Sequence, residues 1–268
     1  MLQKYNINRK AEFIGIDIIL HDLICYNEEL QKPASDSKSL ANKFRYVRNV
    51  FMSLYNVKDL LSTVHVSGNE AFATKKKALQ RELEFIVHVR NKGVGHLDKE
   101  LLKRAAQWEP HVFHEECKEN PEFATLLCYK ALIETCINSY QTARQGNKPF
   151  SSEIDLMYPP NAKEFYEFLA CIVEDSISWL EEARRLVNNE IEYHSAETLL
   201  EMAALAGQTN FDLKEPAEVI VDGTLVQAEF RSMLQELRRQ GVADPVLNQL
   251  EARLIEWEQH SSLKGEES

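Results

Sequence analysis

Apolar residues recur at spacings of three and four along most of this chain, the spacing that lines one face of an α-helix. The segment from Phe13 to Leu30 shows the pattern clearly, and Pro33 ends it. Long stretches without glycine or proline follow the same rule. The pattern predicts helices over residues 9–31, 39–61, 70–90, 99–107, 121–144 and 162–188.

The last third of the chain carries a weaker pattern, with helices predicted over residues 227–240 and 245–259. Just before them, residues 218–226 (EVIVDGTLV) place β-branched residues on both sides of an Asp-Gly dipeptide. That dipeptide is favoured in tight hairpin turns. The sequence therefore predicts an all-α fold, a helical bundle with additional C-terminal helices and at most one small β-hairpin.

A proline-rich loop divides the predicted helices. Residues 146–160 contain Pro149, Pro159 and Pro160, and they carry no helical pattern. We expect a domain boundary there, with a helical bundle over residues 1–145 and a C-terminal helical region over residues 146–268. The C-terminal region has no predicted role, and packing on the same bundle is the alternative to a separate domain.

The composition favours a soluble, cytoplasmic protein. The chain has 268 residues, 44% of them hydrophobic, but no run of about 18 apolar residues, so we expect no membrane-spanning segment. Five cysteines occur without a CxxC pair, which favours free thiols in a reducing compartment. The N-terminal residues lack the apolar core of a signal peptide.

The net charge of −11 argues against broad, non-specific coating of nucleic acids. It leaves room for a local basic surface, because the positive residues are not evenly spread. A cluster of them falls within the first 105 residues: Arg45, Arg48, Lys75, Lys76, Lys77, Arg90 and Lys92.

The segment from Phe85 to Glu100, FIVHVRNKGVGHLDKE, holds the best candidate for chemistry. Arg90 offers a planar fork suited to phosphate oxygens, and His96 can take and give a proton near neutral pH. In a straight helix these two side chains would point to different faces. Two glycines between them favour a break, which would let His96 fold back beside Arg90. The plainer interpretation is a helix C-cap followed by a surface loop.

With Asn91 after Arg90, and five residues between Arg90 and His96, this segment resembles the motif of the HEPN superfamily. The motif is an arginine, a polar residue and then a histidine, with four to six residues between the arginine and the histidine. The resemblance covers residues 5–145 in architecture and only a few residues in motif. It implies a helical bundle and, in many members, a metal-independent endoribonuclease of a bacterial defence or toxin system.

The resemblance also implies a role for each motif residue. His96 would move a proton, Arg90 would stabilise charge on the phosphate and Asn91 would orient the scissile group. Expected substrate contacts are Lys92, Asp98, Lys75 and Lys76. No metal or cofactor is expected. RNA is the expected substrate, and a homodimer with residues 85–100 near its two-fold axis is expected, together with an antitoxin or another defence protein as partner.

Several alternatives compete with this interpretation. Arg81 and His88, and likewise Arg104 and His111, satisfy the same spacing by chance. A non-catalytic helical module that binds a nucleotide or a protein would keep the fold without the reaction. The cluster His111, His114 and Cys117 has zinc-ligand residue types but lacks a second half, so a solvated loop is the favoured interpretation. The chain contains no GxGxxG, Walker, GxSxG or HExxH motif.

Overall fold

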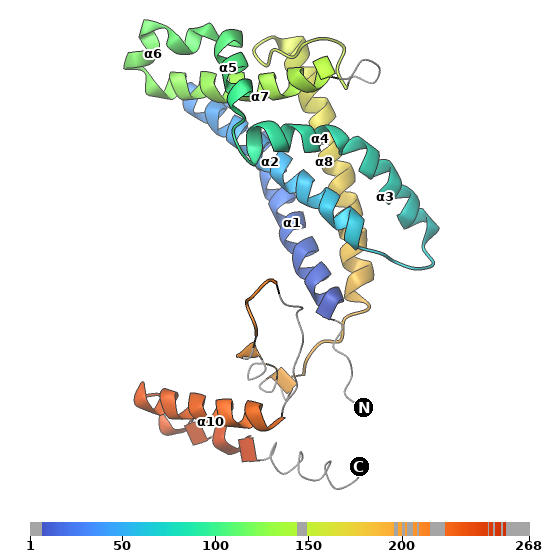
Figure 1. Ribbon diagram of the computed structural model, residues 1–268, viewed down its shortest axis with the longest axis vertical. Helices are drawn as coiled ribbons and strands as arrows, with labels where there is room; N and C mark the ends of the chain where they lie inside the picture. Colours follow the sequence, from blue (N-terminus) through green and yellow to red (C-terminus); the bar gives the residue numbers. More distant parts are fainter. Residues whose placement is uncertain are drawn as a thin grey trace. The chain divides into compact units, whose positions relative to one another are not determined.

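Helices form all the regular secondary structure in the part of the chain that the computed structural model describes. That part comprises residues 7–143, 149–195, 198–199, 202, 206–207, 209–214, 223–245, 247–248, 250–252 and 254–255. The all-α prediction is therefore confirmed for the described residues (Figure 1). The elements are α1 (Ile7–Gln31), α2 (Ser37–Thr63), α3 (Glu70–Glu82), α4 (Glu84–Val89), η1 (Arg90–Val94), α5 (Lys99–Trp108), η2 (Pro110–Phe113), α6 (Glu115–Glu119), α7 (Pro121–Ala143), α8 (Pro159–Asn188) and α10 (Gly223–Arg239).

Local sequence signals explain where several helices begin. Asp36 and Ser39 form a reciprocal capping box at the start of α2, and the Asn69 side chain accepts a hydrogen bond from the Phe72 backbone at the start of α3. Gly68, in the turn between these helices, has φ of 76°, a left-handed conformation that glycine adopts without strain. The short polar segment before Glu70 therefore fixes both the turn and the start of α3.

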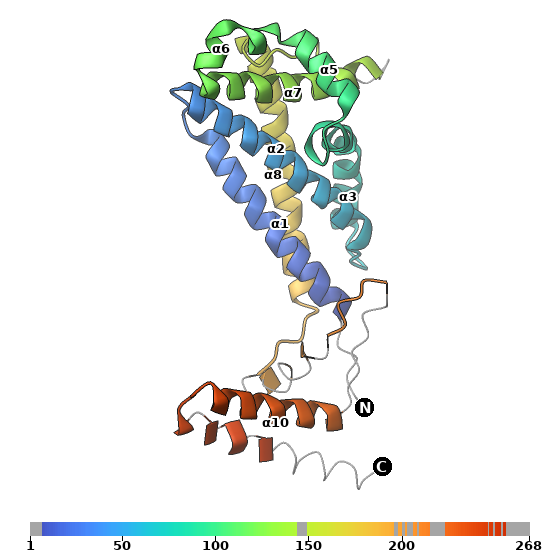
Figure 2. The same cartoon turned by 60° about the vertical axis from the view of Figure 1, so that its left-hand side comes forward.

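The core of the first compact unit lies among the long helices. α2 packs on α1 and α7, and α8 packs on α1 and α3. Figures 1 and 2 show α1, α2 and α8 running together, while α7 crosses one end of them and carries α5 and α6. The largest fully buried side chains include Trp179, Phe44, Phe51 and Phe165. Burying such aromatic surface is the main source of stability for a bundle of this kind.

An aromatic cluster anchors the helix that leads into the candidate motif. Phe85, in α4, is 3% exposed and packs edge-on against Phe51, Tyr140, Phe150 and Phe168. These partners come from α2, α7, the loop before α8, and α8 itself. The backbone just before Arg90 is thus held by several helices at once.

The helix predicted over residues 70–90 is divided in the structure. α3 ends at Glu82, Leu83 is a single turn residue with ψ of −1°, and α4 begins at Glu84. Leu83, Phe85 and Ile86 are all buried in the core. The division lets α4 bury its apolar side chains against α2 and α7 while α3 packs on α8.

The prediction of a β-hairpin over residues 218–226 is wrong for its second strand, which is helical. Gly223 to Val226 form the first turn of α10, and residues 218–222 lie outside the described part of the chain. The reason is tertiary packing: apolar residues that follow in α10 form a small core with a later segment, and a helix places them on one face. This core comprises Phe230, Leu234, Leu247 and Leu254.

The chain divides into two compact units, Met1–Ile191 and Glu192–Ser268. The first unit therefore runs beyond the boundary expected at residues 145 and 146. The physical reason is α8, which follows the proline-rich loop but buries Ile172, Val173 and Trp179 in the core of the first unit. None of the described helices combines the length and the apolar character needed to cross a lipid bilayer.

Candidate functional site

The candidate motif begins with a turn of π-helix. α4 ends at Val89, η1 follows over Arg90–Val94, and the chain bends at Gly95. The Gly95 backbone N–H donates to the Arg90 carbonyl at 2.8 Å, a bond that spans five residues instead of the four of an α-helix. The bend that the two glycines predict is confirmed, although neither glycine has a positive φ. Single π turns of this kind occur often at functional sites.

Gly93 is required by a close approach between helices. A Cβ atom on Gly93 would lie 2.2 Å from the Cys136 Sγ and 3.4 Å from Leu132, both on α7. Only the absence of a side chain lets η1 pack directly on α7. Cys136 is 1% exposed, and burial raises the pKa of its thiol to about 12.

The Arg90 guanidinium is held by a ring, an amide and a glycine. Its Cζ atom lies 4.4 Å from the centre of the Tyr55 ring, and its Nη1 donates to the Asn91 Oδ1 at 3.1 Å. A Cβ atom on Gly95 would lie 3.0 Å from the same Cζ, so the side chain folds back onto the backbone at Gly95. No carboxylate lies within ion-pair distance of Arg90 in the described part of the chain.

His96 follows directly after the glycine that Arg90 contacts. Its side chain is exposed and forms no hydrogen bond with any described residue. The turn after Val94 thus brings the arginine back to the residue beside His96, as a straight helix would not. Arg90 is half-buried and reaches Gly95, the residue before His96, while Asn91 and His96 are exposed.

Lys92 and Asp98 bind each other. The Lys92 Nζ lies 2.7 Å from the Asp98 Oδ2, while the Asp98 Oδ1 accepts from the backbone N–H groups of Glu100 and Leu101 at the start of α5. The hydrogen bond from Lys92 is the largest cause that lowers the pKa of Asp98 to about 2. Both residues were expected to contact substrate, and both are engaged in closing the loop after η1.

Replacing Asp98 by Asn should therefore show a pH-dependent cost. The folded pKa lies below the usual 3.8, so the ionised carboxylate stabilises the fold above about pH 4, and this stabilisation disappears as the pH falls toward 2. We expect the parent to melt at a higher temperature than Asp98→Asn at pH 6, with the difference vanishing near pH 2. Calorimetry at both pH values measures it. An equal difference at both would contradict the ion pair.

The two lysines expected to bind substrate from α3 lie apart from the motif. The Lys76 Nζ donates to the Val64 carbonyl at 2.9 Å and satisfies the C-terminal end of α2. Lys75 is exposed and lines a small pocket between α3 and α8 together with Glu82 and Asp175. The structure does not bring either lysine to Arg90 or His96.

α2 carries two further arginines on about the same face as Tyr55, the residue that Arg90 stacks on. Arg45, Arg48 and Tyr55 share one face of α2, because they are spaced by three and seven residues. Tyr129, on α7, faces the first two: its ring centre lies 5.5 Å from the Arg45 Cζ and 5.8 Å from the Arg48 Cζ. The Arg45 Nε donates to the Tyr129 hydroxyl at 3.1 Å.

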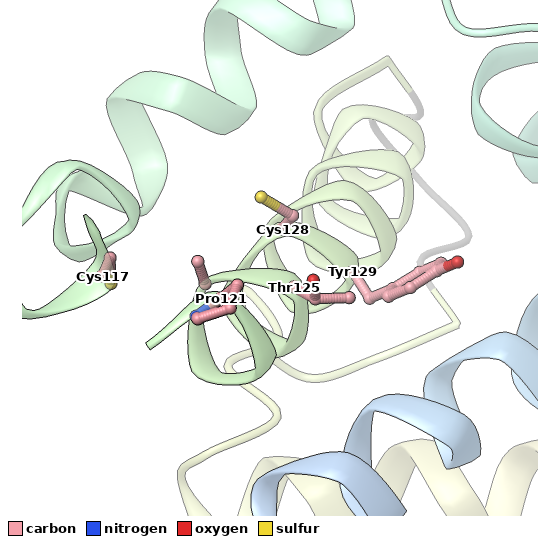
Figure 3. Close-up of a pocket in the computed structure, with 6 residues that line it drawn as sticks. Cys117, Pro121, Thr125, Cys128 and Tyr129 are labelled. Atoms are coloured by element: carbon pink, nitrogen blue, oxygen red, sulfur yellow. The ribbon is translucent and has the colours of Figure 1, made fainter. Parts of the chain in front are cut away.

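A shallow pocket of about 400 Å³ lies beside Tyr129, where α6 meets α7. Figure 3 shows Pro121, Thr125 and Cys128 on one side of it and Cys117 across from them, with the Tyr129 side chain extending away. The Cys117 thiol donates to the His111 carbonyl at 3.2 Å, and the His111 Nδ1 lies 2.9 Å from a Glu109 carboxylate oxygen. The side chains considered for zinc thus make local contacts. Among the described residues, no three His, Cys, Asp or Glu side chains are placed so that they could hold a metal ion.

A buried ionic network near this pocket was missed by sequence reasoning. The Lys130 Nζ lies 2.6 Å from a Glu109 oxygen and 3.2 Å from a Glu134 oxygen, and all three side chains are almost fully buried. Glu134 also accepts from the Trp108 indole at 2.7 Å and from the Leu156 backbone at 2.5 Å. A lysine and a glutamate four residues apart inside the apolar stretch LLCYKALIETCI were the available signal. One lysine thus serves both buried carboxylates and also lies 3.5 Å from Asp155, and burial raises the pKa of Glu134. The network ties α5 and the loop before α8 to α7.

No protein-family model, curated protein sequence or solved structure matches this chain.

Proposed function

We propose that the protein is a metal-independent endoribonuclease of the HEPN type. The observation that carries the proposal is that Arg90, which has no carboxylate partner among the described residues, folds back onto Gly95, and that the next residue is the exposed His96. A fixed cation and an exposed imidazole are the groups that phosphate cleavage by an internal hydroxyl requires.

The reaction follows from the chemistry of these side chains. The ribose 2′-hydroxyl attacks the adjacent phosphorus, the P–O5′ bond breaks, and a 2′,3′-cyclic phosphate and a 5′-hydroxyl end form. His96 carries the proton between the attacking and leaving oxygens, and Arg90 stabilises the charge that gathers on the phosphate oxygens. Asn91, already hydrogen-bonded to Arg90, orients the scissile group.

The proposal includes a homodimer, because one histidine per motif is sparse for both the acid and the base roles. A second copy near the axis at residues 85–100 would supply the second histidine. It also includes a cytoplasmic location, in keeping with the free cysteines, and a role in bacterial defence with an antitoxin or defence protein as partner. These points rest on the resemblance and on composition.

A non-catalytic module is the second candidate. The net charge of −11 favours binding of a nucleotide or protein without turnover, and so does the lack of a titratable group bonded to His96 among the described residues. In that case Arg90 would still bind a phosphate group, but no strand would be cut.

The deciding experiment is cleavage of single-stranded RNA in the presence of EDTA. We expect products with 2′,3′-cyclic phosphate ends and no cleavage of DNA of the same sequence, which lacks the attacking hydroxyl. Mass spectrometry of the products identifies the ends. Cleavage that requires a divalent metal, or binding of RNA without any cleavage, would overturn the proposed reaction.

A further inference from the structure

Three arginines near the motif have no acidic partner. Arg45, Arg48 and Arg90 form no ion pair in the described part of a chain whose net charge is −11. Arg9, Arg184 and Arg185 of the first unit are paired with carboxylates, whereas Arg81 and Arg104 also form no ion pair with a described residue. Arg45, Arg48 and Arg90 differ from the unpaired Arg81 and Arg104 in that each of the three guanidinium groups lies over a tyrosine ring.

These arginines are held in place by aromatic rings. Arg45 and Arg48 lie over Tyr129, and Arg90 lies over Tyr55. The Nε atoms of Arg48 and Arg90 are buried and have no hydrogen-bond partner, which is uncommon for buried polar atoms in folded proteins. The stacking limits the movement of the guanidinium groups, so they can bind an anion with little loss of conformational entropy.

The arginines are spaced along one line. Arg48 and Tyr55 lie seven residues apart on α2, which corresponds to about 10.5 Å along its axis and nearly the same face. A stacked strand of nucleic acid rises about 3.4 Å per nucleotide, so this separation spans about three nucleotides. One strand can therefore place phosphates at Arg90 and at the Arg45–Arg48 pair together.

We propose that Arg45, Arg48 and Tyr129 form a phosphate-binding subsite for single-stranded nucleic acid, about three nucleotides from the Arg90 motif. A single strand is favoured over a duplex because the duplex carries twice the charge per unit length, which the acidic remainder of the chain repels. The subsite rests on the proposed function for its biological substrate. Its binding of a strand is testable without cleavage.

The test measures how salt changes the affinity for a 2′-deoxy oligonucleotide about 12 nucleotides long, which the proposed reaction cannot cleave. For single strands, each phosphate contact contributes about 0.7 to the slope of log affinity against log salt concentration. Replacing Arg45 and Arg48 together by Ala should reduce the slope by about 1.4, as seen by fluorescence anisotropy. Arg81→Ala, which removes an exposed arginine on α3, should leave the slope unchanged.

A second variant separates charge from packing. Replacing Arg45 and Arg48 together by Lys keeps both charges and should retain most of the slope. An unchanged slope in the double Ala variant, or equal affinity of the parent for a duplex, would overturn the subsite. If the slope changes as expected but the parent cleaves no RNA, the subsite stands and the proposed reaction fails.

Discussion

His96→Ala and Arg90→Ala should each lower the rate of RNA cleavage by on the order of 10²-fold or more, without unfolding the bundle. His96 is exposed and forms no hydrogen bond with a described residue, so its removal deletes the proton carrier and little else. Arg90 is half-buried and lies over the Tyr55 ring, and its loss removes the charge that stabilises the reacting phosphate. Single-turnover cleavage with saturating RNA isolates the chemical step.

Three further variants serve as controls for this experiment. Arg90→Lys keeps a positive charge but loses the planar fork, so we expect a partial loss, smaller than that of Arg90→Ala. His88→Ala and His111→Ala remove the histidines of two chance matches to the motif spacing and should cleave like the parent. The melting temperature of each variant shows whether the fold is intact. If all of these variants cleave equally, Arg90 and His96 are not the catalytic residues.

Gly93→Ala should destabilise the protein by about 1–3 kcal/mol, the usual cost of overpacking a filled interior. The added methyl group would lie 2.2 Å from the Cys136 Sγ. Cys136 lies within α7, which packs on several other helices and so cannot shift easily to make room. Urea denaturation of parent and variant measures the change in the free energy of unfolding. The same variant should also lower cleavage, because η1 can no longer rest on α7.

A double variant tests the cause. Cys136→Ala removes the sulfur atom, so the Gly93→Ala methyl group gains room, and the double variant should be more stable than the sum of the two single effects predicts. Gly15→Ala is the control, since a Cβ atom there meets the nearest side chain, Leu60, at an ordinary 3.4 Å. In the middle of α1 it should stabilise the helix by up to about 1 kcal/mol. Additive single effects would mean that the contact with Cys136 is not what requires glycine.

The helices of this fold could be predicted because each long one buries an amphipathic face. α1, α2, α7 and α8 begin and end within a few residues of the predicted limits. The π turn at Arg90 could not be predicted, because it consists of a shift in backbone hydrogen bonding that leaves no pattern in the side chains. The hairpin prediction failed for a related reason, since Gly223 and the following residues join a helix whose packing partners lie far along the chain.

The candidate site was predictable in part. Arg90, Asn91 and His96 could be selected because residue type and spacing indicate their chemistry. The partners of Lys92 and Lys76 could not, because a lysine that closes a loop and a lysine that binds substrate look alike in sequence. The contact between Arg45, Arg48 and Tyr129 joins residues more than 80 positions apart, so only the folded chain reveals it.

The close packing of Gly93 on Cys136 also governs how the protein responds to oxidants and alkylating agents. A thiol reacts through its thiolate, and a pKa of about 12 with 1% exposure leaves Cys136 almost none at neutral pH. Cys25, Cys128 and Cys171 are exposed and would be modified first. The Cys136 sulfur, which packs on Gly93 of the candidate motif, is thus protected from solvent. Oxidants can therefore modify the exposed cysteines while the packing of η1 on α7 stays unchanged.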